Sequence, residues 1–133
     1  MPYIRISVAG DAPTTEQVSE LQRNTTQLMA DILSKRPEVT VVTVESRAAI
    51  DWSIGGNHLA DGQRLAQMEA FITAGTNSDQ EKAEFISAAQ QMICDVLNAA
   101  ISPLYVVISE IDGANWGYDG RTQQFRKLSA QVL

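Results

Sequence analysis

The sequence predicts an α/β fold in which two fused β-α-β units form one four-stranded sheet with two helices on one face. Three observations support this prediction. The chain repeats itself with a period of about 65 residues, each half carries strand patterns on either side of a helix pattern, and a length of 133 residues suits one domain. We therefore expect residues 1–133 to form a single domain of two pseudo-repeats, about 2–65 and 66–133.

The repeat is visible when the chain is shifted by about 65 positions against itself. The segment Val8-Ala9-Gly10 then aligns with Thr73-Ala74-Gly75, and Glu16 aligns with Glu81. With one residue deleted, the turn around Trp52 aligns with the turn around Trp116. Because the landmarks keep their order along the whole chain, they predict a duplicated unit.

The first unit shows the pattern strand, helix, strand. Ile4, Ile6 and Val8 alternate with polar residues, which predicts a half-buried strand. Thr14 followed by a glutamine three positions later predicts a capped helix start, and Pro37 requires that helix to end by residue 36. The β-branched run over 39–44 predicts the second strand.

The second unit repeats this plan with strands over 70–74 and 104–109. Ser78 and Glu81 predict a second capped helix, which Ser102-Pro103 ends. Strands joined by one crossover helix are parallel neighbours, so the two units together predict a four-stranded sheet with both helices on one face. The other face of the sheet must also be covered, and in so short a chain we expect oligomerisation to cover it.

Composition excludes several classes of function. The net charge is −6, which argues against nucleic acid and against anionic membrane surfaces as partners. No apolar run has the length of a membrane span, and no secretory leader is recognisable, so the expected location is cytoplasmic. A single cysteine, Cys94, and a single histidine, His58, exclude a disulfide framework and the usual zinc ligand sets. We expect neither a metal nor an organic cofactor.

Four features carry a resemblance to a known family: Met1-Pro2 opening directly into a strand, the β-α-β unit, a glutamate at the end of the second strand, and an aromatic-glycine turn after it. In these features the chain resembles the tautomerase superfamily, in particular its two-unit, macrophage migration inhibitory factor-like members. The segment from Trp116 to Tyr118, followed by Arg121 and Phe125, is most similar to the malonate semialdehyde decarboxylase branch. The resemblance implies a homotrimer without cofactors.

The resemblance also implies that Pro2 is the catalytic residue once Met1 has been removed. Pro2 then carries a secondary amine at the chain terminus. An α-amine has a pKa of roughly 8, far below the pKa of a lysine side chain. Burial lowers that value further, so a neutral amine is available as a general base near pH 7. The implied reaction is keto–enol isomerisation of a small 2-keto or enol acid.

Further residues follow from the resemblance as a substrate-binding set. Its members are Trp116, Tyr118, Arg121, Phe125 and Glu38. The implied partner is a small substrate that bears a carboxylate. The paired arginines with which the decarboxylase branch binds a carboxylate fall here on Ala74 and Thr76, so the sequence does not identify the group that binds this anion.

Two alternatives to a tautomerase stay open. The first is decarboxylation or hydration of a small three-carbon acid, with a protonated Pro2 as the acid and Glu38 orienting water. The missing arginines weaken this alternative. The second is an oligomeric binding protein that keeps the fold without catalysis, and it predicts that Pro2 does not react with small electrophiles.

Overall fold

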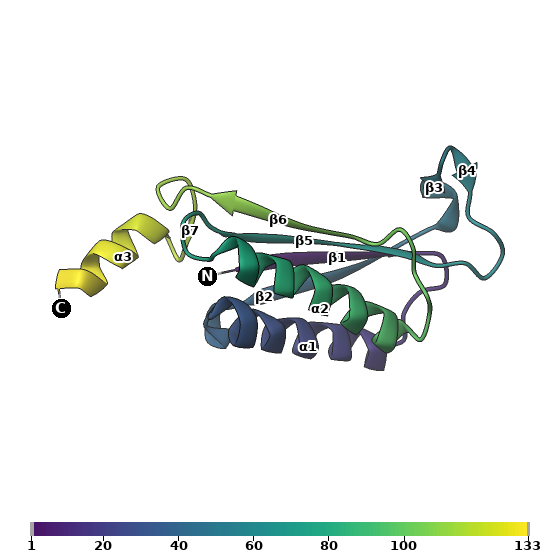
Figure 1. The fold of residues 1–133 in the computed structure, drawn as a ribbon, viewed down its shortest axis with the longest axis horizontal. Helices are drawn as coiled ribbons and strands as arrows, with labels where there is room; N and C mark the ends of the chain where they lie inside the picture. Colours follow the sequence, from purple (N-terminus) through teal and green to yellow (C-terminus); the bar gives the residue numbers. More distant parts are fainter. Residues whose placement is uncertain (1, 133) are drawn as a thin grey trace.

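The two predicted β-α-β units form one mixed sheet in a computed structural model that describes residues 2–132. The first unit consists of β1 (Tyr3–Ala9), α1 (Thr15–Leu33) and β2 (Val41–Arg47). The second consists of β5 (Leu65–Thr73), α2 (Asp79–Leu97) and β6 (Tyr105–Ile111). The strand order is β2-β1-β5-β6, with parallel pairs within each unit and an antiparallel β1–β5 pair between them. Both long helices cover the same face (Figure 1), as predicted.

Smaller elements connect the units and follow the second one. Two short 3₁₀ helices lie on either side of β2, at Pro37–Val39 and Ala49–Asp51. The two aromatic-glycine turns form short hairpins, and the chain then continues into a helix that the sequence analysis did not predict. These elements are β3 (Ser53–Ile54) with β4 (Asn57–His58), β7 (Gly117–Tyr118) with β8 (Arg121–Thr122), and α3 (Gln123–Val132).

Several predicted strand boundaries are wrong. β2 ends at Arg47 rather than at residue 44, β6 spans Tyr105–Ile111 rather than 104–109, and two strand starts differ by two residues or more. The second strand begins at Val41 rather than at residue 39, because Pro37–Val39 form a 3₁₀ turn in which Thr40 N–H bonds to the Pro37 carbonyl at 3.1 Å. The third strand begins at Leu65 rather than at residue 70. All of β1 pairs with β5, and this pairing begins at Leu65, so it stabilises the early part of β5. β5 forms a strand there although it carries polar residues on the open face of the sheet.

The structural repeat has an offset of 64 residues rather than 65. The helix caps Thr14 and Ser78 are 64 residues apart, and each forms a capping box with the residue three positions on. The buried strand positions show the same offset: Ile4 on β1 and Met68 on β5 are 64 residues apart, and both face the core. The counterpart of Pro2 is therefore Ala66, and its nitrogen lies in a mid-chain amide.

The core fills the space between the sheet and its two helices. Apolar side chains with 0% exposure come from both central strands and both helices: Ile4, Ile6, Val8, Met68, Ala70, Ile72, Leu21, Met29, Phe85, Ala89 and Ile93. The opposite face of the sheet carries exposed apolar side chains, among them Val41, Tyr105 and Val107. This uncovered face is consistent with the expectation that another subunit packs there.

Neither a membrane span nor a metal cluster is found in the part of the chain that the structure describes. None of its helices combines the length and the apolar character needed to cross a bilayer. Within residues 2–132, His, Cys, Asp and Glu side chains do not gather in groups of three or more that suit a metal ion.

Candidate active site

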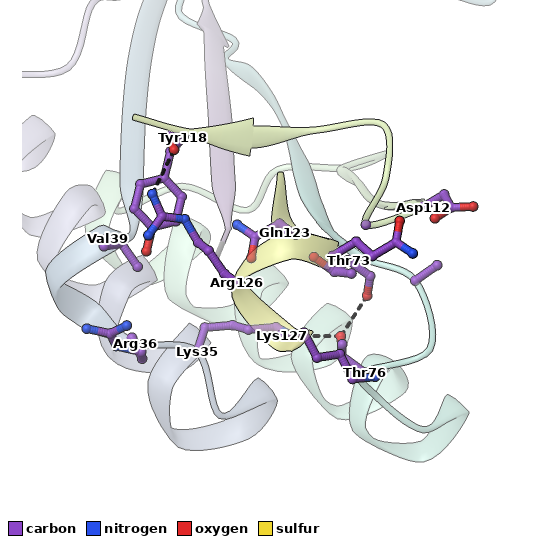
Figure 2. A pocket seen from close by; sticks show the side chains of 13 residues that line it. Lys35, Arg36, Val39, Thr73, Thr76, Asp112, Tyr118, Gln123, Arg126 and Lys127 are labelled. Carbon is purple, nitrogen blue, oxygen red and sulfur yellow. Dashed lines mark hydrogen bonds between the residues drawn. The ribbon is translucent and has the colours of Figure 1, made fainter. Parts of the chain in front are cut away.

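A pocket of about 490 Å³ lies at the end of the sheet where β1 begins and β5 ends. The residues after α1, the end of β5, the β7–β8 hairpin and α3 form its walls (Figure 2). Lys35, Thr76, Tyr118, Gln123 and Arg126 are among the lining residues. The wall thus combines segments that are up to about ninety positions apart in sequence.

Pro2 is buried beside this pocket. Its carbonyl oxygen accepts a hydrogen bond from Val41 N–H at 3.3 Å, which fixes the start of β1 against the start of β2. Tyr3 pairs with Phe71, so the same register sets Pro2 opposite Ile72. The next residue of that strand, Thr73, lines the pocket. The fold therefore brings Pro2 to the sheet end that borders the pocket.

Lys35 reaches the pocket because α1 ends abruptly. Ser34 adopts the left-handed conformation with φ of 58°, and Lys35 N–H bonds back to the Met29 carbonyl at 3.0 Å. The Lys35 side chain is 8% exposed, and its Nζ donates to Thr76 Oγ1 at 2.8 Å (Figure 2). Thr76 Oγ1 in turn donates to the Thr73 carbonyl at 2.6 Å.

Burial lowers the pKa of Lys35, and the negative charges of Glu81 and Glu110 partly oppose that effect. Neither carboxylate contacts the amine. Glu110 forms an ion pair with Lys82, and Glu81 accepts the Ser78 N–H at 2.8 Å. Lys35 is thus a buried cation whose direct side-chain partner is a neutral hydroxyl.

The hairpin and α3 form a second polar wall. Arg126 stacks on Tyr118 with Cζ 3.8 Å from the ring centre, and its Nη2 donates to the Tyr118 carbonyl at 2.9 Å. Two buried donors on the same helix, Arg126 Nε and Gln123 Nε2, have no hydrogen-bond partner among residues 2–132. Because buried donors are normally paired, these two N–H groups indicate a place for an acceptor.

The structure separates the residues that the resemblance implied. Tyr118 lines the pocket, and Trp116 lies beside it with Nε1 donating to Thr73 Oγ1 at 3.1 Å. Arg121 lies over the Phe125 ring, with Cζ 5.2 Å from its centre, and Phe125 is 49% exposed. These two residues and Glu38 are not part of the pocket lining.

Glu38 is exposed and lies 3.8 Å from Arg36 Nε. Sequence reasoning missed Lys35, Gln123 and Arg126, which do line the pocket. The available signal for Lys35 was its position as a basic residue directly after a helix end. Gln123 and Arg126 were missed because the sequence analysis did not predict α3, the helix that carries them.

A smaller pocket of about 440 Å³ lies at the other end of β5. Trp52, Ala66, Gln67 and Tyr105 line it, so it occupies the place in the second unit that the Pro2 region occupies in the first. Its backbone nitrogens at Ala66 and Gln67 belong to mid-chain amides and carry no basic lone pair. The second unit therefore has a mid-chain amide at the position that corresponds to Pro2.

Gly117 is required for the hairpin that holds Tyr118. A Cβ on Gly117 would overlap the carbonyl oxygen of Arg121 and approach the Thr122 Cα to 2.8 Å. We expect Gly117→Ala to separate β7 from β8 and to release α3, since α3 contacts mainly β8. Amide exchange over 116–126 should accelerate, while the free energy of global unfolding changes by less than about 1 kcal/mol.

Hydrogen–deuterium exchange with mass spectrometry measures this effect. Asn115→Ala, an exposed position next to the hairpin, is the control and should keep wild-type exchange rates. Unchanged protection of 116–126 in Gly117→Ala would contradict the assigned role of the glycine.

Comparison with known proteins points to one family. The family model described as "Tautomerase enzyme" matches residues 2–62. A curated relative from Dickeya dadantii (strain 3937), described as "Probable tautomerase K2", is 35% identical over 66 residues. These residues make up 50% of this chain and 98% of the relative, which therefore has about the length of one pseudo-repeat.

Solved structures share the two-unit fold along nearly the whole chain. The structure described as "F6 fused 4-OT wild type asymmetric trimer" is 22% identical with a TM-score of 0.80, and covers 92% of this chain and 98% of its own. The protein Pt0534, inactivated by 2-oxo-3-pentynoate, is 13% identical with a TM-score of 0.83, and covers 93% of this chain and 98% of its own. At these identities the likeness concerns the fold.

Proposed function

The chain belongs to the tautomerase superfamily, and from this premise we propose that Pro2, freed as the first residue by removal of Met1, is the general base of a keto–enol isomerisation. The proposed substrate is a small 2-keto or enol acid. The observation that supports the proposal is the burial of Pro2 beside a pocket whose wall carries Lys35 and Arg126. Such a pocket suits a substrate that bears a carboxylate.

The reaction needs one group that takes a proton and returns it. The neutral amine of Pro2 removes a proton from the carbon next to the substrate carbonyl, and the electron pair of the C–H bond moves toward the carbonyl oxygen. The protonated amine then delivers the same proton to another atom of the delocalised anion. The pyrrolidine ring fixes the direction of the nitrogen, so positioning it costs no side-chain entropy.

The surroundings favour the neutral form of the amine before substrate binds. Burial disfavours a charged Pro2, and the positive charges of Lys35 and Arg126 act in the same direction. The same positive charges stabilise the negative charge that develops on the substrate during proton removal. One set of groups therefore serves both the base and the intermediate.

We also propose that the working form is a homotrimer. The fused 4-OT that shares this fold is described as a trimer, and this chain carries exposed apolar side chains on the open face of its sheet, among them Val41, Tyr105 and Val107. Burial of such a face between subunits is favourable by about 25 cal/mol per Å² of apolar surface. Sedimentation velocity of the full chain tests this part of the proposal.

Covalent labelling tests the central claim about Pro2. We expect 2-oxo-3-pentynoate, which inactivates the structural neighbour Pt0534, to add once to this chain at neutral pH. The added mass should lie on the tryptic peptide that covers residues 2–5, after Met1 has been lost. A neutral amine attacks the electron-poor alkyne carbon, and the intact-protein mass reports the adduct.

Cys94 is the competing nucleophile, so the Cys94→Ala variant is the control and should label to the same extent. Two outcomes would overturn the proposal. One is a mature chain that retains Met1, because the proline nitrogen is then an amide. The other is a free Pro2 that stays unlabelled while the reagent is consumed elsewhere.

A further inference from the structure

We propose that Lys35 is a second reactive amine of this protein, whose Nζ forms an imine with the carbonyl carbon of a small aldehyde or 2-keto acid. The reaction goes beyond the proposed function, because it needs neither Pro2 nor the removal of Met1. Three features support it: the burial of the Lys35 side chain, the hydrogen bond that holds its amine, and the contrast with the other two lysines of the chain.

The Lys35 side chain is enclosed in the pocket wall. It is 8% exposed, and it lines the cavity of about 490 Å³ together with Thr76. Burial disfavours the ammonium form and lowers the pKa of Lys35, although the charges of Glu81 and Glu110 act in the opposite direction. More of the amine is therefore present as free base near neutral pH than at the ordinary pKa of a lysine, and the free base is the nucleophile.

No ion pair keeps Lys35 in its charged form within the part of the chain that the structure describes. The two carboxylates that act on it are engaged elsewhere, since Glu110 accepts from Lys82 and Glu81 accepts the Ser78 N–H. Four further charged residues line the pocket and do not pair with Lys35: Arg36, Asp112, Arg126 and Lys127. Loss of the proton from Lys35 therefore breaks no ion pair among these residues.

The hydrogen bond to Thr76 holds the amine and leaves its lone pair free. Lys35 Nζ donates to Thr76 Oγ1 at 2.8 Å (Figure 2), and Thr76 Oγ1 donates its single hydrogen to the Thr73 carbonyl at 2.6 Å. The hydroxyl can thus accept an N–H from the amine but cannot donate to its nitrogen. The neutral amine is held in place with an unoccupied lone pair, which is what attack on a carbonyl carbon requires.

The reaction needs only the amine and the carbonyl compound, and it releases water. The Nζ lone pair forms a bond to the carbonyl carbon, and the π electron pair of the C=O bond moves to the oxygen. Both N–H protons end on that oxygen, which leaves as water while the C=N bond forms, and hydrolysis reverses these steps. Uptake of a proton from solvent gives a protonated imine. Its positive charge replaces that of the ammonium group, so the electrostatic role of Lys35 in the proposed function is kept.

The other two lysines lack these features. Lys82 forms ion pairs with Asp79 and Glu110, and its hydrogen bond to Glu110 raises its pKa. Lys127 also lines the pocket, but it is exposed on α3. One lysine is thus ion-paired, one is exposed, and one is buried beside a neutral hydroxyl. The three amines can therefore be compared within one molecule.

Reductive trapping with pyruvate tests the proposal on the full-length protein. Sodium cyanoborohydride reduces an imine to a secondary amine, so each trapped lysine gains the mass of pyruvic acid less one oxygen atom. We expect Lys35 to be trapped at least about 10-fold faster than Lys82 or Lys127. Trypsin does not cleave after a modified lysine or between Arg36 and Pro37, so the Lys35 adduct should appear on a peptide that covers residues 24–47.

Three variants assign the trapped amine. Lys35→Arg keeps the positive charge without an amine that forms an imine, and should lose the adduct on this segment. Thr76→Val should slow trapping of Lys35 about 5-fold, the effect of about one hydrogen bond, and leave trapping of Lys127 unchanged. Thr76→Ser should restore the rate. Thr43→Val is the matched control, because Thr43 lies on β2 outside the pocket, and it should trap Lys35 at the wild-type rate.

Two results would overturn the inference. One is trapping of Lys35 that is absent or no faster than trapping of Lys127. The other is an adduct confined to the peptide that covers residues 2–5, which would assign the imine chemistry to Pro2 alone. Labelling of Pro2 by 2-oxo-3-pentynoate does not involve Lys35, so failure of the proposed function is a separate result. The comparison of the three lysines uses the wild type, so a variant that folds poorly does not affect it.

Discussion

Replacing Pro2 with alanine is expected to lower kcat/KM for keto–enol isomerisation of a small 2-keto acid by about 100-fold, the low end of general base effects. Alanine keeps a terminal amine and the carbonyl that bonds to Val41 N–H, so the strand start remains in place. It loses the ring that fixes the nitrogen, and the amine must then be ordered for each reaction. The change in enol absorbance measures the rate.

Pro13→Ala is the matched control for this prediction. Pro13 lies before α1, outside the pocket, and its replacement should leave kcat/KM unchanged. Equal melting temperatures of the Pro2→Ala protein and the wild type would show that the loss concerns chemistry. A Pro2→Ala protein with wild-type kcat/KM would rule out this amine as the base and favour the non-catalytic alternative.

Most of the fold was predictable because its signals are local. The alternation of Ile4, Ile6 and Val8 marks a strand with one buried face, and the capping boxes at Thr14 and Ser78 mark both helix starts. The start of β5 was missed although Ala66, Met68 and Ala70 alternate with polar residues, which is typical of a strand with one buried face. Ala, Met, Gln and Glu are better helix formers than strand formers, and it is the pairing with β1, a tertiary contact, that stabilises a strand here.

The pocket was less predictable, because its groups act through contacts between distant segments. Lys35 reaches the pocket because α1 ends at Leu33, with Ser34 as its C-cap, and because the hydroxyl of Thr76, 41 positions later, accepts a hydrogen bond from its amine. α3 is held by bonds such as Gln124 N–H to the Gly113 carbonyl. Phe125 and Leu128 lie three positions apart, a spacing that suits a helix, and the sequence analysis did not use this signal. Both side chains are exposed, so neither of them packs on the core.

Replacing Phe85 with alanine is expected to lower the free energy of unfolding by about 3–5 kcal/mol. Phe85 has 0% exposure and is the largest fully buried side chain between α2 and the sheet. Its removal costs the transfer free energy of the ring and leaves a cavity that the stiff sheet fills only in part. Urea denaturation followed by far-ultraviolet circular dichroism measures the change.

The neighbouring position provides the control for this stability prediction. Ile86 is 40% exposed on the same helix, and Ile86→Ala should cost no more than about 1 kcal/mol. An equal loss in both variants would contradict the assignment of Phe85 to the core. The folded fraction of Phe85→Ala should keep its kcat/KM per folded molecule, because the cavity lies under the sheet and not in the pocket wall.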